Sequence, residues 1–188
     1  SNPVRKSEHA KYDKYGRRHF VGNFFLNADI WKGLSFKSTF GVDYSYRKQN
    51  NYVPTYNVSP QEAITTSQLT EYRNNNLDWV WSNVLTYNFT LANMHRFTAM
   101  VGTEATYNSF DGIEAVAFDV SENEDMRYIS AAKSNNYKAN SSQGSSSIFS
   151  TFLRLNYSLK DRYLLTATVR SDVSSRFAKE NRRGIFPS

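Results

Sequence analysis

The chain has 188 residues and no cysteine, which excludes a disulfide-stapled domain and any thiolate metal site. Aromatic residues make up 15% of the sequence and no run of about 18 apolar residues occurs, so no transmembrane helix is predicted. The net charge of +6 comes from scattered basic residues, which is typical of solvated loops and a mixed polar face and argues against a nucleic-acid partner.

The N-terminal half begins with a charged segment, residues 1–17, that we predict to be a loop. A first strand is predicted from about Arg18 to Ile30, and a tight turn at 31–33 leads to a second strand, Leu34–Tyr46. In the second strand, six of the seven even positions are apolar or aromatic, and no odd position carries a large apolar side chain. This alternation predicts one apolar and one polar face on a strand about twice as long as the usual 5–6 residues.

The same alternation predicts four further strands: Leu77–Phe89, His95–Tyr107, Ile148–Leu159 and Tyr163–Asp172. Short turns at 90–94 and 160–162 join them in pairs. Long polar connections, 47–76 and 108–147, separate the pairs, and the second ends in the low-complexity stretch Lys133–Ser147. The tail after Asp172 is predicted to be a loop, with the start of another strand at Ile185.

Short turns therefore alternate with long loops, and all the short turns lie at the same end of the strands. Outer-membrane barrels have short periplasmic turns and longer extracellular loops. Aromatic residues on the apolar faces gather near both strand ends, with Leu, Val and Ala between them. This distribution is typical of two interfacial aromatic girdles around an aliphatic band. We therefore predict an all-β fold made of antiparallel strands of a transmembrane β-barrel.

We predict that one face of the strands meets lipid and that the other meets the lumen or a plug. The residues predicted to face lipid are Phe36, Phe40, Tyr44, Trp79, Trp81, Leu85, Val101, Leu155 and Leu165. Those predicted to face the lumen or a plug are Lys37, Asp43, Thr86, Glu104, Arg154, Arg170 and Asp172. For Arg170, Asp172 and Arg176 we favour anchoring of a plug or loop over contact with a substrate, because arginine–carboxylate pairs can be satisfied there.

A soluble antiparallel sheet explains the alternation equally well. It does not naturally explain the strand length, the asymmetry of the loops and the two aromatic bands together. A soluble β-rich binding or adhesion module therefore stays open as the alternative to a membrane barrel.

Specific motifs occur in the last part of the chain, Phe152–Ser188. These motifs are Asn156-Tyr157, the run Arg162–Arg170 (RYLLTATVR), Asp172, Ser174–Phe177 (SSRF) and Phe186–Ser188 (FPS). Looser ones lie earlier: Lys32–Leu34 (KGL), Phe40–Tyr44 (FGVDY) and Asp125–Tyr128 (DMRY). Together they closely resemble the SusC/RagA family of TonB-dependent outer-membrane transporters.

This resemblance implies a 22-stranded barrel of which the chain supplies about six strands. It implies that residues 1–188 are a partial barrel domain, without the plug, the TonB-contacting segment and the C-terminal strands. It also implies a multi-pass barrel in the Gram-negative outer membrane that imports oligosaccharides or peptides with a SusD-like surface lipoprotein. TonB would act through the missing plug, and outer-membrane lipid would surround the wall. A passive porin is the close rival.

Chemical motifs are few, and the sequence predicts no enzyme and no cofactor. His9, His19 and His95 have no paired ligand spacing, so no metal site is predicted from them. Four loop acids could bind Ca²⁺, but they lack the EF-hand glycine and spacing, so solvated acids are favoured: Asp119, Glu122, Glu124 and Asp125. The residues that would contact a substrate are not identifiable from the sequence.

Overall fold

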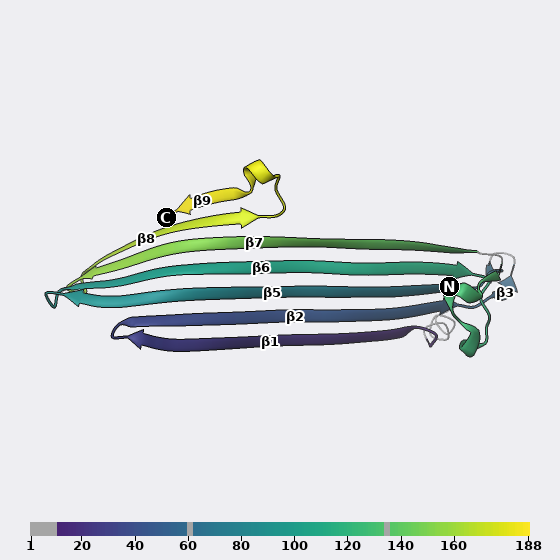
Figure 1. The fold of residues 1–188 in the computed structure, drawn as a ribbon. Coiled ribbons are helices and arrows are strands. Elements are labelled where there is room, and N and C mark those ends of the chain that lie inside the picture. Colours follow the sequence, from purple (N-terminus) through teal and green to yellow (C-terminus); the bar gives the residue numbers. More distant parts are fainter. Residues whose placement is uncertain (1–10, 60–61, 134–135) are drawn as a thin grey trace. The chain divides into compact units, whose positions relative to one another are not determined.

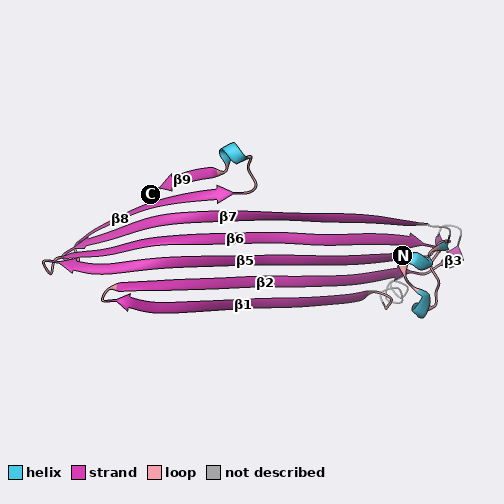
Figure 2. Cartoon of the chain, viewed as in Figure 1, coloured by secondary structure: helices cyan, strands magenta, loops and turns pink. Residues whose placement is uncertain are grey.

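The computed structural model describes residues 11–59, 62–133 and 136–188, and most of them lie in β-strands (Figures 1 and 2). One sheet contains seven strands in the order β1-β2-β5-β6-β7-β8-β9. Its strands are β1 (Lys14–Trp31), β2 (Leu34–Val53), β5 (Gln68–Leu91), β6 (His95–Phe118), β7 (Tyr137–Leu159), β8 (Tyr163–Ser174) and β9 (Arg183–Pro187). The predicted all-β, antiparallel fold is confirmed.

Smaller elements occupy the connections. The two-stranded sheet β3–β4 consists of Tyr56–Ser59 and Glu62–Ile64. Short 3-10 helices occur at η1 (Glu124–Met126), η2 (Ile129–Ala131) and η4 (Lys179–Asn181). Among the residues that the structure describes, no helix is long and apolar enough to cross a membrane.

The three predicted short turns are present, and their backbone explains their tightness. Ala92, Asn93, Lys160 and Asp161 all have positive φ angles, which suits the right-handed twist of the strands that they join. Gly33 has φ +78°, and a Cβ there would lie 2.2 Å from the carbonyl oxygen of Asn88. Only glycine fits this close approach, so Gly33 fixes where β2 starts beside β5.

The predictions of long loops at 47–76 and 108–147 are wrong over much of their length. β2 continues to Val53, β5 starts at Gln68, β6 continues to Phe118 and β7 starts at Tyr137. The added segments are rich in polar residues and their few apolar side chains, such as Tyr52, Leu69 and Ala117, do not continue the regular alternation, so that pattern ends although the strands do not. Backbone hydrogen bonds, which need no particular side chain, continue the ladder through them. β1 likewise begins at Lys14, inside the segment predicted to be a loop.

The chain forms two compact units. The loop-end unit comprises Ser1–His19, Tyr44–Asn76 and Phe110–Gly144, and the turn-end unit comprises Phe20–Asp43, Leu77–Ser109 and Ser145–Ser188. In the loop-end unit a small core forms from buried residues and partly buried neighbours: Tyr52, Leu69, Ala117 and Val120, with Tyr12, Ile129 and Ala132 packed against them.

The turn-end unit keeps large apolar side chains on its surface. Val101 is 51% exposed, Leu153 56% and Leu165 64%. Soluble monomers rarely expose a large contiguous apolar surface. This face of the sheet therefore needs something to cover it.

Packing across the opposite, polar face of the turn-end unit depends on one glycine. A Cβ on Gly102 of β6 would lie 2.4 Å from the ring of Phe152 on β7. The aromatic ring covers the glycine, as occurs when an aromatic side chain fills the space over a strand glycine.

We expect the substitution G102A to destabilise the complete protein by about 1–3 kcal/mol, because the new methyl group overlaps the Phe152 ring. Thermal unfolding in detergent measures the effect. G16A is the matched control, since a Cβ there would find its nearest neighbour, Lys48 O, at 4.0 Å. The double variant G102A/F152L should recover part of the loss. Equal behaviour of G102A and G16A would contradict this packing.

Candidate functional site

A row of aromatic rings identifies one face of the turn-end unit. Phe40 of β2 lies 6.2 Å from Trp79 of β5, and Trp79 stacks on Tyr107 of β6 at 5.8 Å between ring centroids. The Trp81 indole N–H donates to Ser38 Oγ over 3.0 Å on the same face. Side chains alternate along a strand, so the residues predicted to face lipid share this side of their strands.

Of the residues predicted to face lipid, Tyr44 belongs to the loop-end unit. Tyr44 has the same parity as Phe40 in the sequence of β2. Its hydroxyl donates to Asn75 Oδ1 over 3.2 Å. Whether this face meets lipid stays a prediction.

A second row of rings lies near the short turns. Neighbouring centroids are 5.1 Å apart for Tyr87–Phe89, 4.9 Å for Phe89–Phe97 and 4.9 Å for Phe97–Tyr157. His95 extends the row, because its ring stacks on Tyr157 at 5.9 Å and its Nδ1 lies 2.8 Å from the Tyr157 hydroxyl. The role of His95 was missed by sequence reasoning, since a lone histidine beside a turn carries no pairing signal.

The opposite face of the turn-end unit carries a charged network centred on Arg170 of β8. Its Nη2 donates to Glu104 Oε1 over 3.0 Å and to Ser150 Oγ over 2.9 Å, and its Nε donates to Asp172 Oδ1 over 2.7 Å. Ser150 is only 1% exposed. The network thus joins β6, β7 and β8 and satisfies three of the residues predicted to face the lumen or a plug: Glu104, Arg170 and Asp172.

The remaining residues of that set lie apart from the network. Arg154 Nε donates to Thr168 Oγ1 over 3.3 Å, Lys37 is exposed and Thr86 is half-buried. Asp43 lines an open depression of about 620 Å³ on the polar face, together with Asp78, Asn108 and Arg176. Both charge signs and several hydrogen-bonding groups therefore face the same open space.

In the loop-end unit, Arg127 holds the segment after β6 in place. Its guanidinium carbon lies 4.1 Å from the ring centroid of Tyr52 and 4.9 Å from that of Tyr12. A guanidinium over aromatic faces gains a cation–π attraction. Arg127 Nη2 also donates to the Glu122 carbonyl oxygen.

The start of the same segment is fixed by Val120. Its carbonyl oxygen accepts a hydrogen bond of 2.6 Å from Ser67 Oγ and a longer one of 3.4 Å from the Tyr52 hydroxyl. Burial raises the pKa of the Tyr52 phenol above its ordinary value, against the opposing effects of Ser67 and Arg127. Tyr52 therefore stays neutral and able to donate throughout the physiological pH range.

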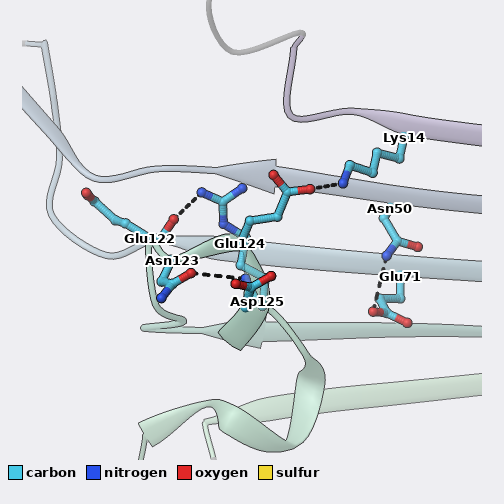
Figure 3. Close-up of polar contacts among 8 residues, drawn as sticks. Lys14, Asn50, Glu71, Glu122, Asn123, Glu124 and Asp125 are labelled. Carbon is cyan, nitrogen blue, oxygen red and sulfur yellow. Dashed lines mark hydrogen bonds and ion pairs between the residues drawn. The ribbon is translucent and has the colours of Figure 1, made fainter.

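Three of the four loop acids considered for Ca²⁺ have separate side-chain partners, and Figure 3 shows the pairing of Glu124 with Lys14. Asp119 lies 3.5 Å from Lys133 Nζ, Glu122 Oε1 accepts from Thr55 over 3.0 Å, and Glu124 pairs with Lys14. The Asp125 backbone N–H donates to Asn123 Oδ1 over 3.1 Å. Hydrogen bonding from Lys14 lowers the pKa of the Glu124 carboxyl. Within the described part of the chain, no three His, Cys, Asp or Glu residues are grouped to hold a metal ion.

Known proteins resemble the chain over its whole length, although no protein-family model matches it. TonB-dependent receptor SusC of Bacteroides thetaiotaomicron is 29% identical over 100% of this chain and 18% of its own length. TonB-dependent receptor P26 of Formosa agariphila is 27% identical over 100% of this chain and 19% of its own length. The chain thus spans about a fifth of the length of these relatives, and the resemblance to SusC/RagA proteins is confirmed.

Solved structures share the fold. The chain superposes on a structure of the RagAB peptide transporter with a TM-score of 0.84 and 24% identity, over 95% of this chain and 20% of that one. The open-open state of the RagAB peptide importer gives a TM-score of 0.82 over the same shares of the two chains.

We expect the ring of Tyr52, more than its hydroxyl, to hold the segment 119–133. Y52F keeps the surface that Arg127 covers, and Ser67 still donates to Val120, so it should cost less than about 1 kcal/mol. Y52L and R127A should each release the segment, because both remove the cation–π contact. Hydrogen exchange of residues 120–133 checks this. Equal exchange in Y52F and Y52L would contradict the assignment.

Proposed function

We propose that this chain is part of the wall of a TonB-dependent transporter in the outer membrane of a Gram-negative bacterium. The observation that carries the proposal is the turn-end unit, whose long strands expose apolar side chains on one face and a polar network on the other. Outer-membrane barrels alternate in this way between lipid and lumen. Similarity to TonB-dependent receptors over all of this chain, and about a fifth of their own length, supports the same conclusion.

The two faces of the sheet in the turn-end unit then meet different surroundings, lipid on one side and the lumen or a plug on the other. The face with Phe40, Trp79 and Leu85 meets lipid, where its exposed apolar area is covered. The face with Arg170, Glu104 and Asp172 meets the lumen or a plug, and pairing within the sheet lowers the cost of placing these charges there. Arg176, which donates to Ser146 Oγ over 3.2 Å, anchors the chain after β8.

The strand lengths indicate how far the wall extends. A tilted spanning strand needs about 9–11 residues, whereas β5 and β6 have 24 residues each. The surplus residues belong to the loop-end unit, where polar side chains are more frequent along the strands. These extensions therefore need not lie in hydrocarbon, and within the loop-end unit residues 119–133 pack against them.

Transport itself belongs to the complete protein. We propose that residues 1–188 are a partial barrel domain, and that the whole protein imports oligosaccharides or peptides with a SusD-like lipoprotein while TonB acts through a plug. Relatives and structural neighbours named SusC and RagAB peptide transporter support this assignment. The role is one of binding and passage, without enzymatic chemistry.

Lysine substitutions on neighbouring positions of β5 test the assignment of the faces. L85K should impair insertion by about 2–4 kcal/mol if the position lies near the bilayer midplane, because a lysine ammonium would face hydrocarbon. T86K places the same charge on the polar face and should be much milder. Folding of the complete protein into lipid vesicles, followed by resistance to proteolysis, measures the difference.

Equal effects of L85K and T86K would overturn the assignment of the faces. Recovery of the complete protein from the soluble fraction without detergent would favour the alternative of a soluble β-rich binding module. Uptake that persists unchanged in cells lacking TonB would favour a passive porin over an importer.

A further inference from the structure

The short turns of the turn-end unit do not end level with one another. The β1–β2 turn lies short of the β5–β6 turn (Figure 1). The Asn88 N–H donates to Gly33 O over 2.7 Å, and β5 then continues through Phe89, Thr90 and Leu91, beyond the start of β2. A notch results beside β5. In an antiparallel strand alternate amides point to the same side, so the Thr90 N–H points past the end of β2 into this notch.

The notch is an open depression of about 590 Å³ whose lining combines cations and aromatic rings: Lys32, Tyr87, Phe89, Thr90, Arg96 and Phe97. All three rings belong to the second aromatic row. Lys32 is exposed, and the described residues offer its ammonium group no ion-pair partner. The Lys32 ammonium, the Arg96 guanidinium and the amide and hydroxyl of Thr90 therefore border the notch. By alternation along β5 and β6, the side chains of Thr90 and Arg96 lie on the polar face and the three rings on the apolar face, so the notch at the strand ends opens to both faces.

Further positive charge lies on the same rim. The Lys160 N–H donates to Met94 O over 2.9 Å, which ties the β7–β8 turn to the β5–β6 turn. Lys160 and Arg162 lie in that turn. The carboxylates nearby are Asp161, which pairs with Arg96, and Asp29, which lines a neighbouring depression with Lys32. Four cations thus face two carboxylates, so the rim is positive on balance.

We propose that this notch binds the headgroup of an anionic phospholipid, with the phosphate near Lys32, Arg96 and Thr90 and the upper acyl chain against Tyr87, Phe89 and Phe97. The proposal rests on the membrane placement proposed above and adds a defined lipid site to it. Charge complementarity selects an anionic headgroup, and basic residues near a membrane surface attract such lipids. Aromatic rings and basic side chains at the interface suit the boundary between headgroup and hydrocarbon.

The test uses the complete protein in detergent, with phosphatidylglycerol as the probe and phosphatidylcholine as the neutral comparison. Native mass spectrometry counts retained lipid, and thermal unfolding reports stabilisation. We expect preferential retention of phosphatidylglycerol and a higher Tm with it. K32Q should weaken phosphatidylglycerol binding by about fivefold, the change that corresponds to the ~1 kcal/mol attributed to one basic residue near an anionic surface.

K138Q is the matched control, because it removes one lysine from the loop-end unit and should leave phosphatidylglycerol binding unchanged. R96K keeps the charge and should retain most of the binding. R96Q should lose it, and its far-UV spectrum establishes whether the barrel is still folded.

A folded, membrane-inserted protein that retains both lipids equally would overturn the lipid site and leave the transporter assignment intact. Equal weakening by K32Q and K138Q would overturn it as well, since the effect would then be one of overall charge. Inorganic phosphate that raises the Tm as much as phosphatidylglycerol does would show a plain anion site and overturn the lipid assignment. A protein that never inserts into membranes would instead contradict the proposed function.

Discussion

The structure depends on backbone pairing between neighbouring strands. In the turn-end unit there is no second layer and no buried apolar core, so the ladder of N–H···O=C bonds is what holds the strands in place. This arrangement satisfies the backbone polar groups without using the side chains. Both faces of the sheet are therefore free to meet different surroundings, which is the condition for a barrel wall in lipid.

Side chains then sort by environment. On one face, aromatic rings contact one another across β2, β5, β6 and β7, while on the other Arg170 gathers a serine and two carboxylates from three strands. In the loop-end unit, side-chain packing adds to backbone pairing. A small buried core forms there from Tyr52, Leu69, Ala117 and Val120, and Arg127 covers the ring of Tyr52. The segment after β6 is thus held by packing, in contrast to the open sheet of the turn-end unit.

The sequence predicts the turn ends of the strands well and the loop ends poorly. Near the turns, alternation of residues such as Phe36 and Lys37 tracks the two faces, and Gly33 marks the tight connection. Beyond Tyr46 and before Leu77 polar residues predominate without regular alternation, so a strand and a loop have similar compositions. The charged partners Glu104, Arg170 and Asp172 were assigned to one face by parity alone. The contacts of Arg127 and His95 depend on which strands lie side by side, and no local pattern contains that information.

The unequal connections have a consequence for the order of assembly. The turns at Gly33, Ala92–Asn93 and Lys160–Asp161 close hairpins over very few residues, so the entropy lost in forming them is small. Pairing β2 with β5, or β6 with β7, closes a much longer stretch of chain and is correspondingly slower. Loop-closure entropy therefore favours early pairing within the three hairpins, where each turn also sets the register. No short turn sets the register at the seams between hairpins, so those seams depend on the side chains that meet across them.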